Sequence, residues 1–270
     1  MTIEVINGYY TGLLIPEVRD SGLPRYQLSQ KMLSMDQIKS ILDDPSRVAA
    51  RMRFPSNQWI VNQGQVGSCN GMSCAKALQR ARVIQGMGFV ALSGEGAYAQ
   101  MNGGRDQGSA LSAGMKVMLE NGIPPESMVP RFQWRWSAIS QEAKDARVRF
   151  KAAECYAIES EMELASAIAM GFMCVIAVHA SGNYSSLDSD GVSRQSLGSG
   201  NHSVGAQDVR IRNGELQFDS FNSWGSNWGQ GGCNWVTWKR HLSSTIRYHQ
   251  FFAVRAAHDD PQGNNPPQVK

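Results

Sequence analysis

The chain has 270 residues, of which 42% are hydrophobic and 18% are charged, and this composition predicts a folded protein with a sizeable core rather than a disordered chain. The net charge of +3 lacks the general excess of positive charge that a nucleic-acid-wrapping protein needs. The five cysteines are few and odd in number, and they form no Cys-x-x-Cys pair, which argues against a disulfide framework and a structural zinc site.

Residues 1–60 contain many glycines and prolines and are expected to be irregular. A single helix is predicted near residues 34–42, with Asp36 in its first turn. The first residues include an early acid and no long apolar run, so no signal peptide is expected.

The middle of the chain shows helical patterns. After Cys69, apolar residues recur at helical spacing as far as Ile84, and Gly86 follows them. Two more helices are predicted, over residues 110–121 and 161–170, and a glycine follows each of them directly. The most apolar stretch, residues 167–178, is too short to cross a bilayer and is expected in the core.

The last third of the chain favours strands. One is predicted over residues 172–178, and the alternating pattern of residues 204–220 is interrupted by Asn213-Gly214, which is a strong hairpin signal. Further strands are predicted at residues 235–238 and 250–254. Helices followed by strands indicate an α+β protein with two lobes.

Three segments carry residues that suit nucleophilic catalysis. Cys69 lies at the start of a predicted helix, where exposed backbone amides favour a thiolate. A histidine partner stabilises the thiolate and later protonates the leaving amine. The segments are Asn62-Gln63-Gly64-Gln65-Val66-Gly67-Ser68-Cys69, Gly200-Asn201-His202-Ser203-Val204 and Asn222-Ser223-Trp224-Gly225-Ser226-Asn227-Trp228-Gly229.

Together and in this order, the segments resemble the papain family of cysteine peptidases. The family's motifs are Gln-Gly-x-x-Gly-Ser-Cys, Asn-His-x-Val and Asn-Ser-Trp-Gly-x-x-Trp-Gly. The separation of Cys69 and His202 is 202 − 69 = 133 residues, within the family's spacing of about 130–150. The resemblance covers about residues 55–255.

The resemblance implies a role for each matching residue. Cys69 would be the nucleophile, His202 its acid–base partner, and Asn222 the group that orients His202. Gln63 would donate a hydrogen bond to the oxyanion together with the Cys69 backbone amide. Six further residues would bind the substrate: Gly67, Gly103, Gly104, Gly200, Asn201 and Trp224.

The resemblance also implies a fold. It is the papain-like two-lobe α+β fold, with a helical left lobe, an antiparallel β-barrel-like right lobe and the active-site cleft between them. We divide the chain into an N-terminal extension (1–54), a peptidase domain (55–258) and a flexible C-terminal tail (259–270). The extension is expected either to cover the cleft or to bind a protein partner. The substrate is expected to be a peptide or protein, with no nucleic acid, membrane, metal or organic cofactor involved.

The sequence departs from the family pattern at a few positions. Secreted members have a disulfide where this chain has Val66 and Met101, and both halves are missing together. Asn70 replaces the usual aromatic residue after the nucleophile, and Cys233 replaces a usual tyrosine. These features favour a disulfide-poor prokaryotic or viral type of member, located in the cytoplasm or associated with a virion.

Three functions remain open on the sequence alone. The favoured one is an endopeptidase that acts through a covalent acyl-enzyme. The alternative is a non-catalytic binding or structural subunit, for instance in a virus particle or larger assembly, because the extension shows no long helical pro-segment. A third is a different acyl transfer, such as amidase, deubiquitinase-like or transpeptidase chemistry, which the same three side chains could perform.

Overall fold

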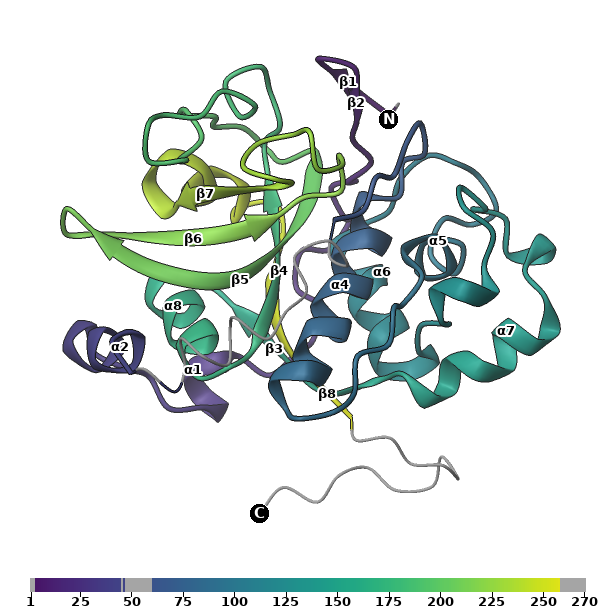
Figure 1. Ribbon diagram of the computed structural model, residues 1–270, viewed down its shortest axis with the longest axis horizontal. Helices are drawn as coiled ribbons and strands as arrows, with labels where there is room; N and C mark the ends of the chain where they lie inside the picture. Colours follow the sequence, from purple (N-terminus) through teal and green to yellow (C-terminus); the bar gives the residue numbers. More distant parts are fainter. Residues whose placement is uncertain (1–2, 45, 47–59, 258–270) are drawn as a thin grey trace.

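The protein consists of a lobe built on a β-sheet and a lobe built from helices, with α4 (Cys69–Ile84) between them (Figure 1). The structure is a computed structural model that describes residues 3–44, 46 and 60–257. The predicted domain boundary at residues 54 and 55 and the predicted tail lie outside the described residues. The expected two-lobe α+β architecture is confirmed.

The sheet lobe contains one antiparallel sheet of six strands in the order β3-β8-β4-β5-β6-β7. The predicted hairpin is present, and its turn residues Asn213 and Gly214 have the positive φ angles of 52° and 75° that this dipeptide favours. The predicted strand at residues 235–238 begins earlier and ends at Thr237. The strands are β3 (Ala152–Ile158), β4 (Met173–Val178), β5 (His202–Arg212), β6 (Glu215–Phe221), β7 (Cys233–Thr237) and β8 (Phe251–Ala256); β3 was not predicted.

The helical lobe packs around α4, in which every residue from Cys69 to Arg82 is buried. A helix that is covered on all sides is a core helix, and α4 contacts both the sheet and the helices beyond it. The other helices are α1 (Tyr26–Ser29), α2 (Met35–Leu42), α5 (Gly94–Tyr98), α6 (Leu111–Lys116), α7 (Gln141–Ala146), α8 (Glu161–Ala169) and α9 (Ser243–Thr245), with short turns η1 (Val117–Asn121), η2 (Glu126–Met128), η3 (Trp136–Ala138), η4 (Arg147–Arg149) and η5 (Trp238–Leu242).

The predicted helix ends are explained by local hydrogen bonds and glycines. Ser34 caps α2 in a reciprocal capping box with Gln37, and the Ser160 side chain caps α8. The helix predicted over residues 110–121 is α6, which continues as the π-helical turn η1 and ends at Gly122, where φ is 82°.

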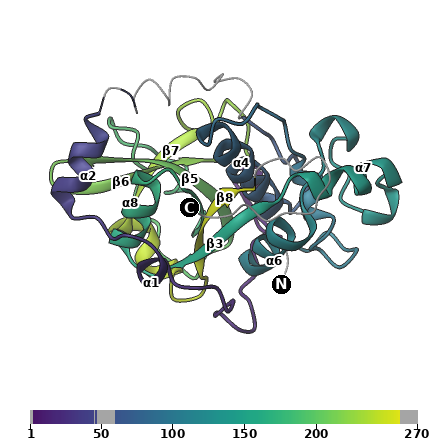
Figure 2. The ribbon, with the colours of Figure 1, turned by 90° about the horizontal axis from the view of Figure 1, so that it is seen from below.

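The N-terminal region is more ordered than the sequence analysis predicted. The expectation of irregular structure there is wrong in part, because β1 (Val5–Ile6) and β2 (Tyr9–Tyr10) form a hairpin around Asn7-Gly8. Further on, Tyr26, Leu33 and Ile38 belong to the main hydrophobic core. α2 packs on α8 beside the sheet, at the end of the molecule opposite α7 (Figure 2).

Residues 3–15, which we call the strap, run between the two lobes (Figure 1). On the sheet lobe, the backbone amide of Leu13 donates to the carbonyl of Asn201 (3.0 Å). On the helical lobe, Ser109 donates to the carbonyl of Gly12 (2.9 Å) and accepts from the amide of Leu14 (3.1 Å). The strap is therefore hydrogen-bonded to both lobes.

All five cysteines lie in the described part of the chain, and each is a free thiol. None of the helices that the structure describes combines the length and apolar character needed to span a bilayer.

Candidate active site

Cys69 is the first residue of α4, as predicted, and its side chain is fully buried. The loop before it is held by Asp106, whose carboxylate accepts hydrogen bonds from the Gly67 amide (2.9 Å) and the Tyr98 hydroxyl (2.8 Å). The sequence analysis gave Asp106 no such role. The loop therefore holds the thiol at the amino end of a buried helix, where the backbone dipoles favour negative charge.

His202 and Asn222 lie on neighbouring strands, and their side chains are hydrogen-bonded. His202 begins β5, Asn222 directly follows β6, and Nε2 of the imidazole lies 2.7 Å from Oδ1 of the amide. The Ser223 backbone amide donates to the same Oδ1 (2.7 Å), so this oxygen is an acceptor and Nε2 carries the proton. In a neutral imidazole Nδ1 is then unprotonated, and it has no hydrogen-bond partner among the described residues.

Two tryptophans shelter the His202–Asn222 pair. The Trp224 ring stacks on the imidazole with centroids 4.4 Å apart and an interplanar angle of 26°. Trp228 meets Trp224 edge-on at 5.3 Å, and both indoles are almost fully buried. Excluding water from a hydrogen bond in this way strengthens it electrostatically.

Gln63 is buried next to the same segment. Its backbone amide donates to the Ser223 carbonyl (2.8 Å), and its side-chain oxygen accepts from the Ser223 hydroxyl (2.5 Å). Its side-chain amide nitrogen donates to the Val66 carbonyl (2.8 Å). This nitrogen has two hydrogens, so one hydrogen bond leaves the second available to an oxyanion.

Burial keeps both catalytic candidates uncharged. Burial raises the pKa of the Cys69 thiol to about 12, although backbone amides of Ser203 and Gly12 partly offset this effect. Burial lowers the pKa of His202 to about 4, and the hydrogen bond that the imidazole donates to Asn222 opposes this shift. With the strap in place, a neutral thiol and a neutral imidazole are therefore favoured over a thiolate–imidazolium pair.

The strap passes directly over the loop that carries the nucleophile. A Cβ atom on Gly12 would lie 2.2 Å from the Gly67 carbonyl oxygen, and one on Gly108 would lie 2.2 Å from the Gly12 carbonyl oxygen. No side chain fits at such distances, so only glycine can occupy position 12 in this arrangement. The backbone amide of Gly12 is also among those that stabilise a negative Cys69.

Two and three residues before Gly12, the strap contacts Trp224. The Tyr9 ring stacks on the indole at 4.9 Å with an interplanar angle of 17°, and the indole N–H donates to the Tyr10 carbonyl (2.8 Å). The sequence analysis did not find these strap contacts. The Asn7-Gly8 dipeptide, which is a typical hairpin turn, was the signal that ordered structure begins there.

Of the predicted substrate-binding residues, Asn201 lies against the strap and accepts from the Gly12 (3.3 Å) and Leu13 amides. Gly67 and Trp224 also contact the strap, as described above. Gly200 has a φ of 91° and packs against His249, which a Cβ atom would approach to 2.8 Å. These four residues thus surround the strap, which occupies the space between the lobes.

For Gly103 and Gly104, the predicted substrate-binding role stays a prediction. Both are exposed, and no atom lies within 4 Å of the Cβ position of either. On the helical lobe, the strap backbone pairs with Ser109, which no motif marked. Asn70 positions it, because its side-chain amide donates to the Ser109 hydroxyl (3.1 Å) and the Ala110 carbonyl (2.7 Å). Asn70, which replaces the aromatic residue usual in the family, therefore connects α4 to the start of α6.

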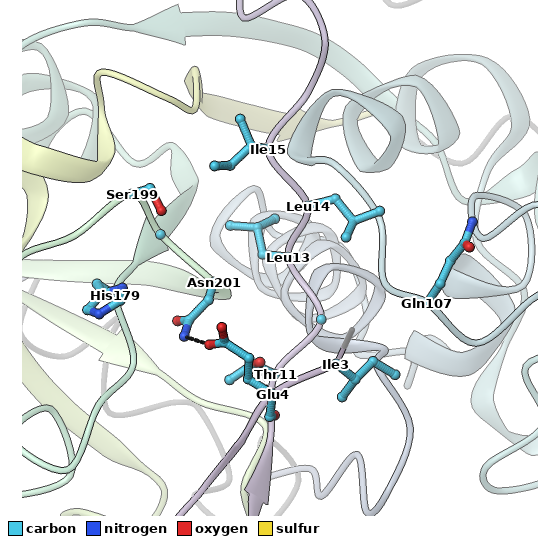
Figure 3. A pocket seen from close by; sticks show the side chains of 12 residues that line it. Ile3, Glu4, Thr11, Leu13, Leu14, Ile15, Gln107, His179, Ser199 and Asn201 are labelled. Carbon is cyan, nitrogen blue, oxygen red and sulfur yellow. Dashed lines mark hydrogen bonds between the residues drawn. The ribbon is translucent and has the colours of Figure 1, made fainter. Parts of the chain in front are cut away.

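A cavity of about 280 Å³ remains beside the strap (Figure 3). The strap itself supplies one wall through Leu13, and His179 and Asn201 lie on the sheet side. The Asn201 amide donates to the Glu4 carboxylate (2.6 Å) across the edge of this cavity. The cavity is therefore the part of the space between the lobes that the strap leaves unfilled.

Within residues 3–44, 46 and 60–257, no group of three or more His, Cys, Asp or Glu side chains is placed to bind a metal ion. The chemistry that this site offers comes from its thiol, imidazole and amides.

Comparison with protein families places the chain in one of them. Residues 45–253 match the family model described as "Papain family cysteine protease". The match covers most of the chain, and the chain belongs to the papain family of cysteine proteases. A comparison with curated protein sequences gives no significant match.

Solved structures with the same fold include xylellain, a cysteine protease from Xylella fastidiosa, with 18% identity and a TM-score of 0.68, covering 94% of this chain and 99% of that one. Procathepsin B S9 from Trypanosoma congolense has 18% identity and a TM-score of 0.64, covering 91% and 86%. The bromelain protease from Ananas comosus has 18% identity and a TM-score of 0.60, covering 73% and 92%. At these identities the similarity establishes the fold.

Proposed function

We propose that the protein is a cysteine endopeptidase that hydrolyses peptide bonds through Cys69, His202 and Asn222. The observation that carries this proposal is the His202–Asn222 hydrogen bond at 2.7 Å, which leaves Nδ1 as a buried base without a partner among the described residues. Membership of the papain family implies peptide substrates.

The reaction follows from these protonation states. The Cys69 thiol transfers its proton to Nδ1 of His202, and the sulfur attacks the peptide carbonyl to form a tetrahedral oxyanion. The Cys69 backbone amide and the Gln63 side chain donate hydrogen bonds to that oxyanion. The imidazolium then protonates the leaving amine, and the C–N bond breaks to give a thioester. Water, deprotonated by the imidazole, hydrolyses the thioester and releases the free thiol.

We further propose that the strap inhibits this reaction in the intact chain. Gly12 lies against Gly67 and next to the thiol, and the strap pairs with Asn201 and Ser109 where a substrate would have to bind. Displacing the strap would hydrate Cys69 and His202, which removes the burial that keeps them neutral. The other expectation for residues 1–54, that they bind a protein partner, stays a prediction.

A pair of cysteine variants tests the proposed activity. In a full-length chain that also carries Gly12→Val to displace the strap, Cys69→Ala should abolish thiol-dependent cleavage of a fluorogenic peptide. The matched control is Cys74→Ala, in the same helix and equally buried, which should retain the activity. Undiminished cleavage by the Cys69→Ala variant would overturn the proposal and favour the binding or structural alternative.

A further inference from the structure

Asp106 links the loop that carries the nucleophile to the helical lobe. One oxygen of its carboxylate accepts hydrogen bonds from the Gly67 amide (2.9 Å) and from the hydroxyl of Tyr98 (2.8 Å), the last residue of α5. Hydrogen bonds to a charged acceptor are about twice as strong as those between neutral groups. A single carboxylate therefore joins α5 to the backbone two residues before Cys69.

Tyr98 fixes the position of this carboxylate. Its ring is fully buried, and its hydroxyl accepts a hydrogen bond from the Gly108 amide (2.9 Å) while it donates to Asp106. The single proton of the hydroxyl is thus directed at the carboxylate. Because a buried ring whose hydroxyl is held from both sides does not reorient easily, the carboxylate has a rigid support.

The space around Gly67 is tight on the side of Asp106. A Cβ atom on Gly67 would lie 3.2 Å from the carboxylate oxygen and 2.7 Å from the side chain of Ile3 in the strap. Asp106 is half-buried, whereas its neighbours Arg105 and Gln107 are exposed. The carboxylate therefore lies directly against the backbone of the nucleophile loop.

The backbone that Asp106 holds leads directly to the reacting groups. Ser68 follows Gly67, and next comes Cys69, whose thiol is the proposed nucleophile and whose amide is a proposed oxyanion donor. The hydroxyl of Ser68 has no hydrogen-bond partner among the described residues, so that side chain adds no further anchor there. The direction of the Cys69 amide therefore depends on how firmly Gly67 is held.

We propose that Asp106 is a positioning residue of the enzyme: by holding the Gly67 amide, its carboxylate keeps the thiol and the amide of Cys69 in the geometry that the reaction needs. It acts through the loop and touches no reacting atom. A displacement of about 1 Å in an active site can lower the rate about 100-fold. The proposal rests on the proposed peptidase function and adds to it a residue that lies outside the three motifs.

The test compares two replacements of Asp106 in the full-length Gly12→Val chain. Asp106→Asn keeps an oxygen that can accept from both donors, whereas Asp106→Leu keeps the branched shape and has no acceptor. Rates are divided by the concentration of active sites, titrated with a peptidyl epoxysuccinyl inhibitor, so that unfolded protein does not contribute. We expect Asp106→Leu to lower kcat about 10- to 100-fold with KM changed less than about 2-fold, and Asp106→Asn to keep kcat within about 3-fold.

Asp188→Leu is the matched control. Asp188 also accepts two hydrogen bonds, from the amides of Asp190 and Val192 (both 3.0 Å), but it holds the loop between β4 and β5, and kcat should stay within about 2-fold. A merely structural role for Asp106 would reduce the fraction of active sites and leave kcat per active site unchanged. An unchanged kcat in Asp106→Leu, or equal losses in the Leu and Asn variants, overturns the inference and leaves the peptidase function intact.

Tyr98→Phe covers the case in which Asp106→Leu does not fold. This replacement keeps the buried ring and removes the hydroxyl, so the carboxylate loses one of its two donors and its support. We expect kcat per active site to fall about 3- to 10-fold at an unchanged KM, and an unchanged kcat overturns the inference. If the Gly12→Val chain itself cleaves no peptide, the proposed function fails and the inference fails with it.

Discussion

Gly12 and Gly67 touch through their backbones, with so little space that a Cβ atom on Gly12 would lie 2.2 Å from the Gly67 carbonyl oxygen. This contact connects the strap to the loop that precedes the nucleophile. Because even the methyl group of an alanine would not fit there, the position of the strap between the lobes depends on glycine at position 12.

Replacing Gly12 should therefore displace the strap. We expect Gly12→Ala and, more strongly, Gly12→Val to make the strap accessible, because a side chain cannot enter the contact. Limited proteolysis with chymotrypsin measures this, since Tyr9, Tyr10, Leu13 and Leu14 are potential cleavage sites that the closed strap protects. The control is Gly88→Ala, a position with open space around its Cβ. An unchanged rate of cleavage in Gly12→Val would show that the strap adapts.

The strap and Tyr26, which follows it in the chain, should tolerate removal differently. Removing residues 1–18 should leave the chain folded, whereas losing Tyr26 should not be tolerated, because that ring is fully buried against Tyr156 and Phe172. Tyr26→Ala should lower the free energy of unfolding by about 3–5 kcal/mol, measured by urea denaturation. Leu28→Ala, at a side chain that is 81% exposed, is the control and should change it by less than about 0.5 kcal/mol. A Tyr26→Ala variant of normal stability would contradict the role of Tyr26 in the core.

Asn222 should act by positioning His202. In the Gly12→Val chain, Asn222→Ala removes a hydrogen bond to a group that becomes charged, and kcat/KM should fall by about 10- to 100-fold. Because the hydrogen bond raises the pKa of His202, its loss should also shift the alkaline limb of the pH–rate profile to lower pH. A fall in rate with no shift of that limb would indicate a purely structural role.

Acid should destabilise the intact protein through two buried histidines. Burial lowers the pKa values of His202 and His249 to about 4, against about 6.5 in the unfolded chain. The unfolded state therefore binds more protons between these values, and the free energy of unfolding falls as the pH drops from about 6.5 to 4. Urea midpoints at pH 7 and pH 4.5 measure the fall, which should be smaller in a His249→Gln variant. A stability that is constant over this range would contradict the buried, neutral state of both rings.

Much of the fold and part of the site follow from local sequence signals. Asn213-Gly214 predicted the β5–β6 turn because its positive φ angles suit those two residues, and Ser34 and Ser160 cap helices that were predicted nearly to the residue. The motifs around Cys69 and His202 predicted both the family and the elements on which these side chains lie.

The rest depends on contacts between distant parts of the chain. Nothing in the sequence around Gly12 shows that it contacts Gly67, and nothing in the sequence around Ser109 shows that it pairs with the strap. Strand β3 was missed because its burial alternates only in part, so its pattern is weak. Tertiary packing decides such positions, and a single sequence does not record it.

The rate at which Cys69 reacts with a peptidyl epoxysuccinyl inhibitor tests the central claim most directly. Intact-mass and peptide-mapping mass spectrometry would compare the unmodified full-length chain with the Gly12→Val variant. The account predicts a single label at Cys69, formed at least about 10-fold faster in the variant, with Cys74, Cys155 and Cys174 unlabelled. Equal rates in both chains would contradict the strap as a cover, and a folded variant whose Cys69 never reacts would contradict the peptidase site itself.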